Sequence, residues 1–215
     1  MQSSKLFTAS LLIFGFLTPA HSFDGHRQGF VLGGGMGPSL NTYSFSDDSG
    51  SYPRENKMGL VFHQFIGYGF TSQFQVLFYA GLNRIPANHA GKVFNDNNGA
   101  VQGVNDFSVG ISSRIYLTSD SLFFRSPYFT FGIGHDLWST EGGHSALAMR
   151  AGEASGPVFS AGLGYEFLKH LDLQWDVSYA HDSQDFVRGG FLSDGNWAYD
   201  VKSFSFQLKL IAIAY

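Results

Sequence analysis

The sequence contains no cysteine, few charged residues and few prolines. The absence of cysteine excludes disulfide frameworks, thiolate metal sites and cysteine nucleophiles. Charged residues make up only 14% of the chain, against about 25% in a typical soluble domain. The net charge of −4 leaves no basic excess that could neutralise phosphates, so we predict no nucleic-acid partner.

Long hydrophobic runs are also missing. No segment after the N-terminal region is long and apolar enough to form a membrane-spanning helix. Aromatic residues, by contrast, are abundant at 17%, with 23 Phe and 10 Tyr in 215 residues. This apolar content excludes disorder. Two classes remain, an aromatic-rich soluble β protein and a membrane barrel.

The N-terminal region has the features of an export signal. Lys5 precedes an apolar stretch over residues 6–17, Pro19 follows it, and Ala20-His21-Ser22 supplies small residues for a cleavage site. The apolar stretch is too short to span a bilayer as a helix. We therefore expect residues 1–22 to be a cleaved signal peptide and residues 23–215 to form the mature β-barrel domain.

Strict alternation of apolar and polar residues organises the rest of the chain. In Leu171–Tyr179 every odd residue is apolar and every even residue is polar, which is typical of a strand with two different faces. Less regular versions of the pattern recur along the chain. The predicted strands are 28–40, 57–68, 72–83, 106–117, 127–138, 157–167, 171–181 and 200–215.

Long and short connections alternate between these strands, as an up-and-down barrel with one looped end requires. Strands of about ten residues match the hydrocarbon thickness when they are tilted. The predicted fold is all-β, a single eight-stranded antiparallel up-and-down transmembrane β-barrel in the outer membrane. Both chain ends should lie on the periplasmic side, and the surface loops should be 41–56, 84–105, 139–156 and 182–199.

The direction of the polar face follows from the cost of exposing charge to lipid. A lysine or arginine on the lipid-facing side costs roughly 2–4 kcal/mol at mid-membrane. The charged side chains should therefore point into the lumen, and they are Arg114, Asp136, Glu166, Asp172, Asp176 and Lys209. Because an unpaired buried charge is unfavourable, Arg114 should pair with Glu166, Asp172 or Asp176.

Crowding in the lumen excludes a porin, because eight strands leave room for side chains but not for an aqueous channel. Glycines on the inward face suit this crowding, and they are Gly33, Gly35, Gly110, Gly132, Gly162 and Gly164. Two aromatic girdles are expected at the membrane interfaces. Near the short turns they would contain Tyr68, Tyr165 and Phe167, and near the long loops Trp138, Tyr179, Trp197 and Tyr199.

The last predicted hairpin contains Gly164-Tyr165-Glu166-Phe167, His170 and Leu171–Tyr179, and the terminal residue is the aromatic Tyr215. These segments resemble the opacity-protein and outer-membrane-protein-X type barrels. The resemblance implies contact with outer-membrane lipid and lipopolysaccharide, and recognition of the C-terminal strand ending at Tyr215 by the barrel assembly machinery. It also implies a monomer without a cofactor. Tyr215 has the opposite parity to outward Phe204 and Leu210, so either a bulge near Leu210 shifts the phase or Tyr215 is recognised in another geometry.

Residues that could carry chemistry are few. The eight histidines show no ligand spacing, so no metal site is predicted. His181, Ser183 and Asp200 are the one candidate constellation, since a serine, a histidine base and a carboxylate on neighbouring strands could hydrolyse an ester. They resemble the lipid-facing site of the lipid A deacylases, although Gln184 stands where that motif has Asn and Lys202 where the closest register would have an acid.

Two functions therefore compete. We favour a non-enzymatic outer-membrane barrel that presents four surface loops for adhesion, envelope integrity or host contact, with an extracellular partner that the mixed loop charges do not identify. The alternative is a lipid A deacylase-type esterase acting at the outer leaflet through His181, Ser183 and Asp200.

Overall fold

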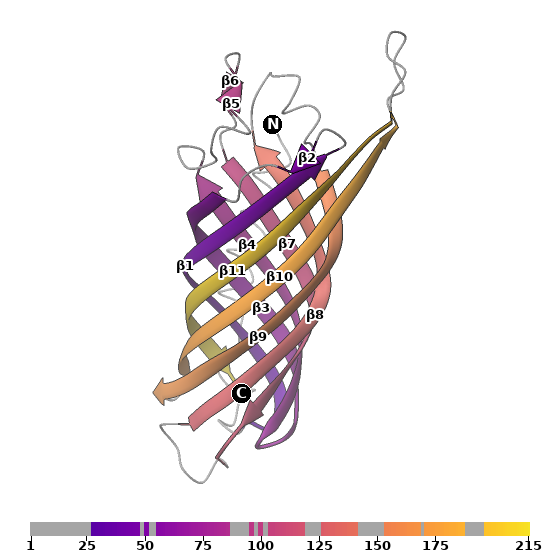
Figure 1. Ribbon diagram of the computed structural model, residues 1–215. Coiled ribbons are helices and arrows are strands. Elements are labelled where there is room, and N and C mark those ends of the chain that lie inside the picture. The colour runs from indigo at the N-terminus through magenta and orange to yellow at the C-terminus, as the bar shows by residue number, and fades with distance from the viewer. Residues whose placement is uncertain are drawn as a thin grey trace, which may run out of the picture.

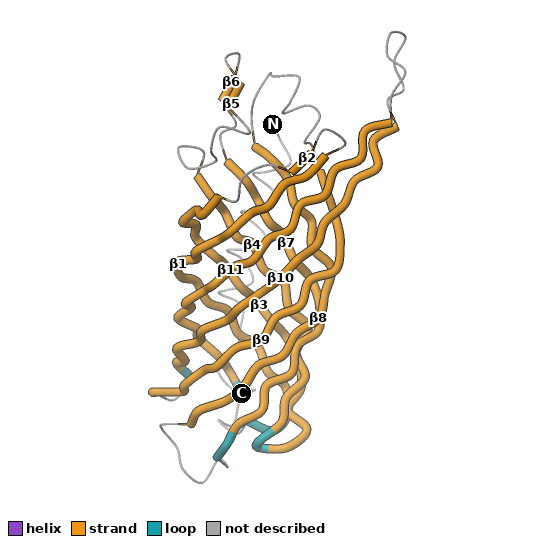
Figure 2. Tube along the Cα trace, viewed as in Figure 1, coloured by secondary structure: helices purple, strands orange, loops and turns teal. Residues whose placement is uncertain are grey.

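The computed structural model describes residues 27–47, 50–51, 55–86, 95–96, 99–100, 103–118, 126–141, 153–168, 170–187 and 196–215. The expected signal peptide and about half of the expected loop residues lie outside these ranges. Among the described residues no helix is long and apolar enough to cross a membrane. The described secondary structure consists entirely of strands and the turns between them (Figure 2).

Eight long strands form one closed antiparallel barrel (Figure 1). In chain order they are β1 (Gly29–Asp47), β3 (Glu55–Thr71), β4 (Phe74–Pro86), β7 (Gly103–Tyr116), β8 (Ser126–Glu141), β9 (Glu153–Leu168), β10 (Leu171–Val187) and β11 (Asn196–Ala214). Each pairs with the next, and β1 pairs with β11 from Leu32–Ala214 to Asp47–Tyr199, which closes the barrel. The predicted fold class is confirmed.

Three two-residue strands lie in the connections. They are β2 (Gly50–Ser51), which pairs with the end of β1, and β5 (Asn95–Asp96) with β6 (Gly99–Ala100). We call the end of the barrel that carries them the loop end. The opposite end, called the turn end, carries the β3–β4 and β9–β10 turns and the C-terminus (Figure 1).

The strands extend further toward the loop end than predicted. β1 ends at Asp47 rather than 40, β10 ends at Val187 rather than 181, and β11 begins at Asn196 rather than 200. In Figure 1 the ends of β10 and β11 project beyond the other strands. Beyond the apolar band the outward residues are polar, such as Thr42, Ser44 and Ser46 on β1, so the outward apolar stripe ends although backbone pairing continues.

The two faces of the wall divide as the alternation predicts. All six charged residues expected to point inward are buried, at 5% exposure or less. The outward face is mostly apolar from the turn end up to neighbouring pairs such as Leu40–Met58 and Tyr179–Phe204. An eight-stranded lumen therefore holds the charged residues, and the apolar residues form the outer band.

One girdle residue was wrongly assigned. Tyr68, Phe167 and Tyr179 are exposed on the outward face as predicted, but Trp138 is 1% exposed and points inward. It shares the parity of Asp136 on β8, so alternation itself turns it into the lumen. The side chains of Trp197 and Tyr199 lie outside the described residues.

The inward glycines and the last strand resolve two further expectations. A Cβ at Gly33 would meet the ring of Phe65, and one at Gly164 would meet the ring of Tyr128. Their small size is therefore required by neighbouring aromatic rings. The pairing of β11 runs to Ala214 with β1 and to Ala212 with β10, in both cases without a register shift. The bulge near Leu210 is therefore not present, and Tyr215 points into the lumen, where it is 3% exposed.

Candidate functional site

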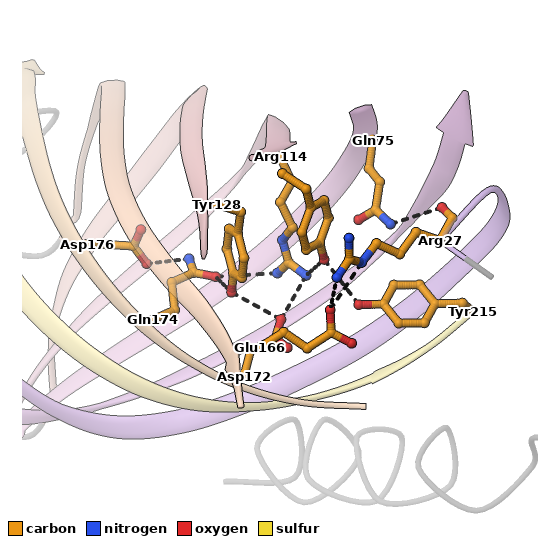
Figure 3. A network of polar contacts seen from close by, with 10 residues as sticks. Arg27, Gln75, Arg114, Tyr128, Glu166, Asp172, Gln174, Asp176 and Tyr215 are labelled. Atoms are coloured by element: carbon orange, nitrogen blue, oxygen red, sulfur yellow. Dashed lines mark hydrogen bonds and ion pairs between the residues drawn. The ribbon is translucent and has the colours of Figure 1, made fainter. Parts of the chain in front are cut away.

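The turn end of the lumen contains Arg27, which lies two residues before β1 (Figure 3). Its guanidinium donates to Glu166 Oε2 from Nη2 at 2.6 Å and from Nε at 3.1 Å. Nη1 donates to the carbonyl oxygen of Thr118 at 2.9 Å, and the guanidinium lies 4.0 Å from the ring centre of Tyr116. Both ion-pair side chains are buried. A charge-assisted pair of this geometry holds the start of the barrel against β9.

A second buried ion pair lies deeper in the lumen. Arg114 Nη1 donates to Asp172 Oδ2 at 3.2 Å, and Nη2 donates to Gln174 Oε1 at 3.3 Å. The hydroxyl of Tyr128 donates to the same carboxylate oxygen at 3.1 Å. The predicted pairing of Arg114 across the lumen is confirmed, and Asp172 is its partner. The guanidinium lies 4.6 Å from the ring centre of Tyr128, which adds a cation–π contact.

Tyr116 joins the two ion pairs, because it contacts both Arg27 and Arg114, and it also meets the last residue of the barrel. The hydroxyls of Tyr215 and Tyr116 are 3.1 Å apart. Tyr116 also accepts from Arg114 Nη1 at 3.4 Å. Residues from the start, middle and end of the chain thus meet in one network (Figure 3).

A third ion pair continues the network toward the centre of the lumen. Lys209 Nζ contacts Asp176 Oδ2. Gln174 Nε2 donates to the same oxygen at 2.6 Å, and Thr130 Oγ1 donates to Oδ1 at 3.0 Å. Each carboxylate of the three described ion pairs therefore has a cation as its partner, as buried charges require.

The loop half of the lumen is built differently. A cavity of about 60 Å³ lies above the network, lined by small and polar side chains, and it has room for about four water molecules. Asp136 interacts with Asp106 and Asp182. In the part of the chain that the structure describes, neither carboxylate oxygen of Asp136 or Asp182 accepts a hydrogen bond.

An apolar cluster lies at the same end. Its members come from five strands and are Ile85, Val104, Trp138, Ala154 and Val201, with Tyr43 packed against them. Within the described ranges no group of three or more His, Cys, Asp or Glu residues could hold a metal ion.

The candidate esterase residues lie outside the barrel, just above the apolar band. The β10–β11 register places Ser183 directly opposite Asp200, and His181 opposite Lys202. His181 Nε2 is 3.7 Å from Asp200 Oδ1, which is too long for a hydrogen bond, and both side chains are partly exposed. Between Ser183 and His181, both among the described residues, there is no hydrogen bond. The side chain of Gln184 lies outside the described residues.

The structure thus brings the three residues to one place without assembling a working triad. Strand register, which the loop between Ser183 and Asp200 left open, puts the serine and the carboxylate on neighbouring strands at pairing distance. Lys202, rather than an acid, faces the histidine directly.

Sequence reasoning missed Arg27 as a luminal residue, because it precedes the predicted first strand. One signal was present. The predicted inward charges comprise two cations, Arg114 and Lys209, against four carboxylates, and this imbalance calls for a further cation. Tyr215 was missed as a network member for a different reason, because terminal aromatics were read as an assembly signal.

Comparison with known proteins agrees with this architecture. The family model described as the outer membrane protein beta-barrel domain matches residues 8–211. Comparison with curated proteins finds no match. The solved structure of the outer membrane protein AlkL in lipid bilayers is similar at 21% identity, with a TM-score of 0.51, covering 91% of this chain and 94% of that one.

Two other solved structures are more distant. The outer membrane protein OprG from Pseudomonas aeruginosa matches at 14% identity and a TM-score of 0.48, covering 90% of this chain and all of that one. The outer membrane enzyme PagL matches at 12% identity and a TM-score of 0.35, covering 79% of this chain and 97% of that one. Similarity at these levels carries no argument about activity.

Proposed function

Because the chain belongs to the outer membrane protein beta-barrel domain family, we propose that it is a non-enzymatic outer-membrane barrel that presents its loop-end connections for adhesion, envelope integrity or host contact. The closed lumen carries this proposal. Arg27, Arg114 and Lys209 with their carboxylate partners fill the turn half, and the cavity beside them measures about 60 Å³. A barrel that cannot conduct acts through its surface.

Loop trimming in cells that lack the natural copy tests the proposal. Two connections are each replaced by a short turn that leaves the strands intact. They are residues 87–102 between β4 and β7, and residues 142–152 between β8 and β9. The full chain should restore surface adhesion or detergent resistance, and the trimmed chain should not. Heat-modifiable gel mobility checks that both versions fold. If the trimmed barrel restores everything, the function lies in the barrel wall and the proposal is wrong.

Conductance provides an independent test of the closed lumen. The intact protein in planar bilayers should give no large, steady current, because an eight-stranded lumen has room for side chains but not for an aqueous channel. A steady conductance comparable to that of a porin would require a wider pore than eight strands provide, and it would contradict the proposal.

The proposed partners in the membrane follow from the outward face. The apolar band would contact lipid and lipopolysaccharide directly. Recognition of the C-terminal strand by the barrel assembly machinery would precede barrel closure, because Tyr215 is buried in the lumen once β11 pairs with β1. Replacing Tyr215 with Ala should then slow membrane insertion in cells more than it slows refolding in detergent.

A second candidate function is a lipid A deacylase-type esterase. The specific observation in its favour is the pairing of Ser183 with Asp200, with His181 Nε2 3.7 Å from the same carboxylate. In such a reaction His181 would take the Ser183 proton while Oγ attacks the ester carbonyl carbon. His181 would then protonate the leaving alcohol, and water would release the fatty acid from the acyl-serine.

Mass spectrometry of lipid A separates the two candidates. If the barrel is not an esterase, cells with the natural chain, with Ser183→Ala and without the protein should contain lipid A of the same acylation. Loss of one fatty acid that depends on both Ser183 and His181 would make the protein an enzyme. Thr42→Ala, on the outward face of β1 at the same end of the barrel, is a matched control that should change nothing.

A further inference from the structure

Gln64 is a polar residue at the middle of an apolar strand face. It points outward from β3 and is exposed. The other outward residues of this strand's apolar band are Met58, Leu60 and Phe62 on the loop side, and Ile66, Tyr68 and Phe70 on the turn side. Three apolar residues therefore separate Gln64 from each edge of the band. Its amide lies near the centre of the membrane.

The amide of Gln64 has no partner in the described part of the chain, where no hydrogen bond involves it. A primary amide in hydrocarbon without a hydrogen bond costs about 4–8 kcal/mol relative to water. Acyl chains offer neither donors nor acceptors, and the ester groups of lipids lie at the interface. Polar residues that face the membrane core therefore indicate an interaction site.

The outer surface of the barrel is recessed around Gln64, because the neighbouring side chains are small. Its direct neighbours in the sheet are Gly34 on β1 and Ala80 on β4, and Ala212 on β11 follows Gly34. Larger side chains, Ile66 and Phe78, border the depression. A groove of about 550 Å³ results on the outer surface. Small residues of this kind let two membrane-embedded walls approach closely.

We propose that this groove is a dimer interface, in which Gln64 of one barrel exchanges hydrogen bonds with Gln64 of a second copy. A primary amide carries both a donor and an acceptor, so it is complementary to itself. Two copies inserted in the same direction are related by an axis along the membrane normal, which keeps each residue at its own depth. A mid-membrane amide near that axis therefore faces its counterpart. This inference replaces the expectation of a monomer.

Cysteine cross-linking in intact outer membranes is the first test. The chain contains no cysteine, so a single introduced thiol reports one position only. Gln64→Cys should give a disulfide-linked dimer on mild oxidation. The matched control is Leu163→Cys, an outward residue in the middle of β9 on the opposite wall that is 55% exposed, and it should remain monomeric. Equal cross-linking at both positions, or none at Gln64→Cys, would overturn the proposal.

The monomer–dimer equilibrium in lipid vesicles is the second test, measured by energy transfer between labelled copies. Gln64→Leu should weaken the dimer about threefold to fifteenfold, the range for one hydrogen bond between membrane segments. Ala212→Leu keeps the amide of Gln64 but places a larger side chain in the groove, and it should also weaken the dimer. Heat-modifiable mobility shows whether each variant folds. A natural chain that stays monomeric with bound lipid, or a dimer unaffected by both substitutions, would contradict the inference.

Discussion

In the turn half of the lumen each described ion pair joins a cation to a carboxylate, whereas in the loop half Asp136 and Asp182 interact with each other and accept no hydrogen bond among the described residues. The turn half is therefore held by directional contacts between strands that are distant in sequence. The loop half relies on an apolar cluster around Trp138. The difference indicates that stability is concentrated at the turn end, which leaves the loop end free to vary.

Removing the buried cation of Arg114 should have the largest effect on this comparison. Arg114→Met should lower the free energy of unfolding by about 3–5 kcal/mol, because Asp172 stays buried without its cation. Urea titration in lipid vesicles, followed by gel mobility, measures the change. Arg114→Met combined with Asp172→Leu should recover much of the loss. A single variant within about 1 kcal/mol of the natural chain would show that the pair does not hold the turn end.

Arg27 tests the same half of the lumen from its edge. Arg27→Ala should lower the free energy of unfolding by about 1.5–3 kcal/mol through loss of charged hydrogen bonds to Glu166. The loss should be smaller than for Arg114, since water reaches the end of the barrel more easily. Gln28→Ala, next to it and exposed, is the control and should stay within about 0.5 kcal/mol.

Two matched substitutions should give opposite signs if the two halves differ as described. Asp136→Asn relieves a crowd of three carboxyl groups, because Asp136 interacts with both Asp106 and Asp182, and it should raise the free energy of unfolding by about 1–2 kcal/mol. Asp172→Asn removes the charged partner of Arg114 and should lower the free energy of unfolding. The same urea titration at neutral pH compares them. Destabilisation by both would mean that the loop half also contains a stabilising charge network.

The smallest expected effect concerns the chain terminus. Tyr215→Phe removes the hydroxyl that meets Tyr116 at 3.1 Å and should cost about 0.5–1 kcal/mol. Tyr68→Phe, on the exposed outward face, serves as the control and should cost less. A cost of several kcal/mol for Tyr215→Phe would show that the terminus holds the barrel closed more strongly than one hydroxyl contact can.

Much of the candidate site could be predicted because strand alternation is a local property. Arg114, Asp172 and Glu166 point inward as expected from parity alone. Arg27 could not be placed in this way, since it lies outside the alternating segment and reaches the lumen only where the chain enters β1. The position of Trp138 near the long loops predicted a girdle residue. Its place in the alternation of β8 turns its side chain into the lumen instead.

The sequence by itself determined the strands, the face on which each residue lies and the class of fold, since each of these depends on neighbours two residues apart along one strand. Only the tertiary structure decided which inward residues meet: Arg114 with Asp172, Arg27 with Glu166, and Tyr116 with Tyr215. It also decided that Ser183 stands opposite Asp200. The physical reason is that contacts across a lumen, and between strands joined by long loops, depend on the stagger at which the barrel closes, which alternation along a strand does not encode.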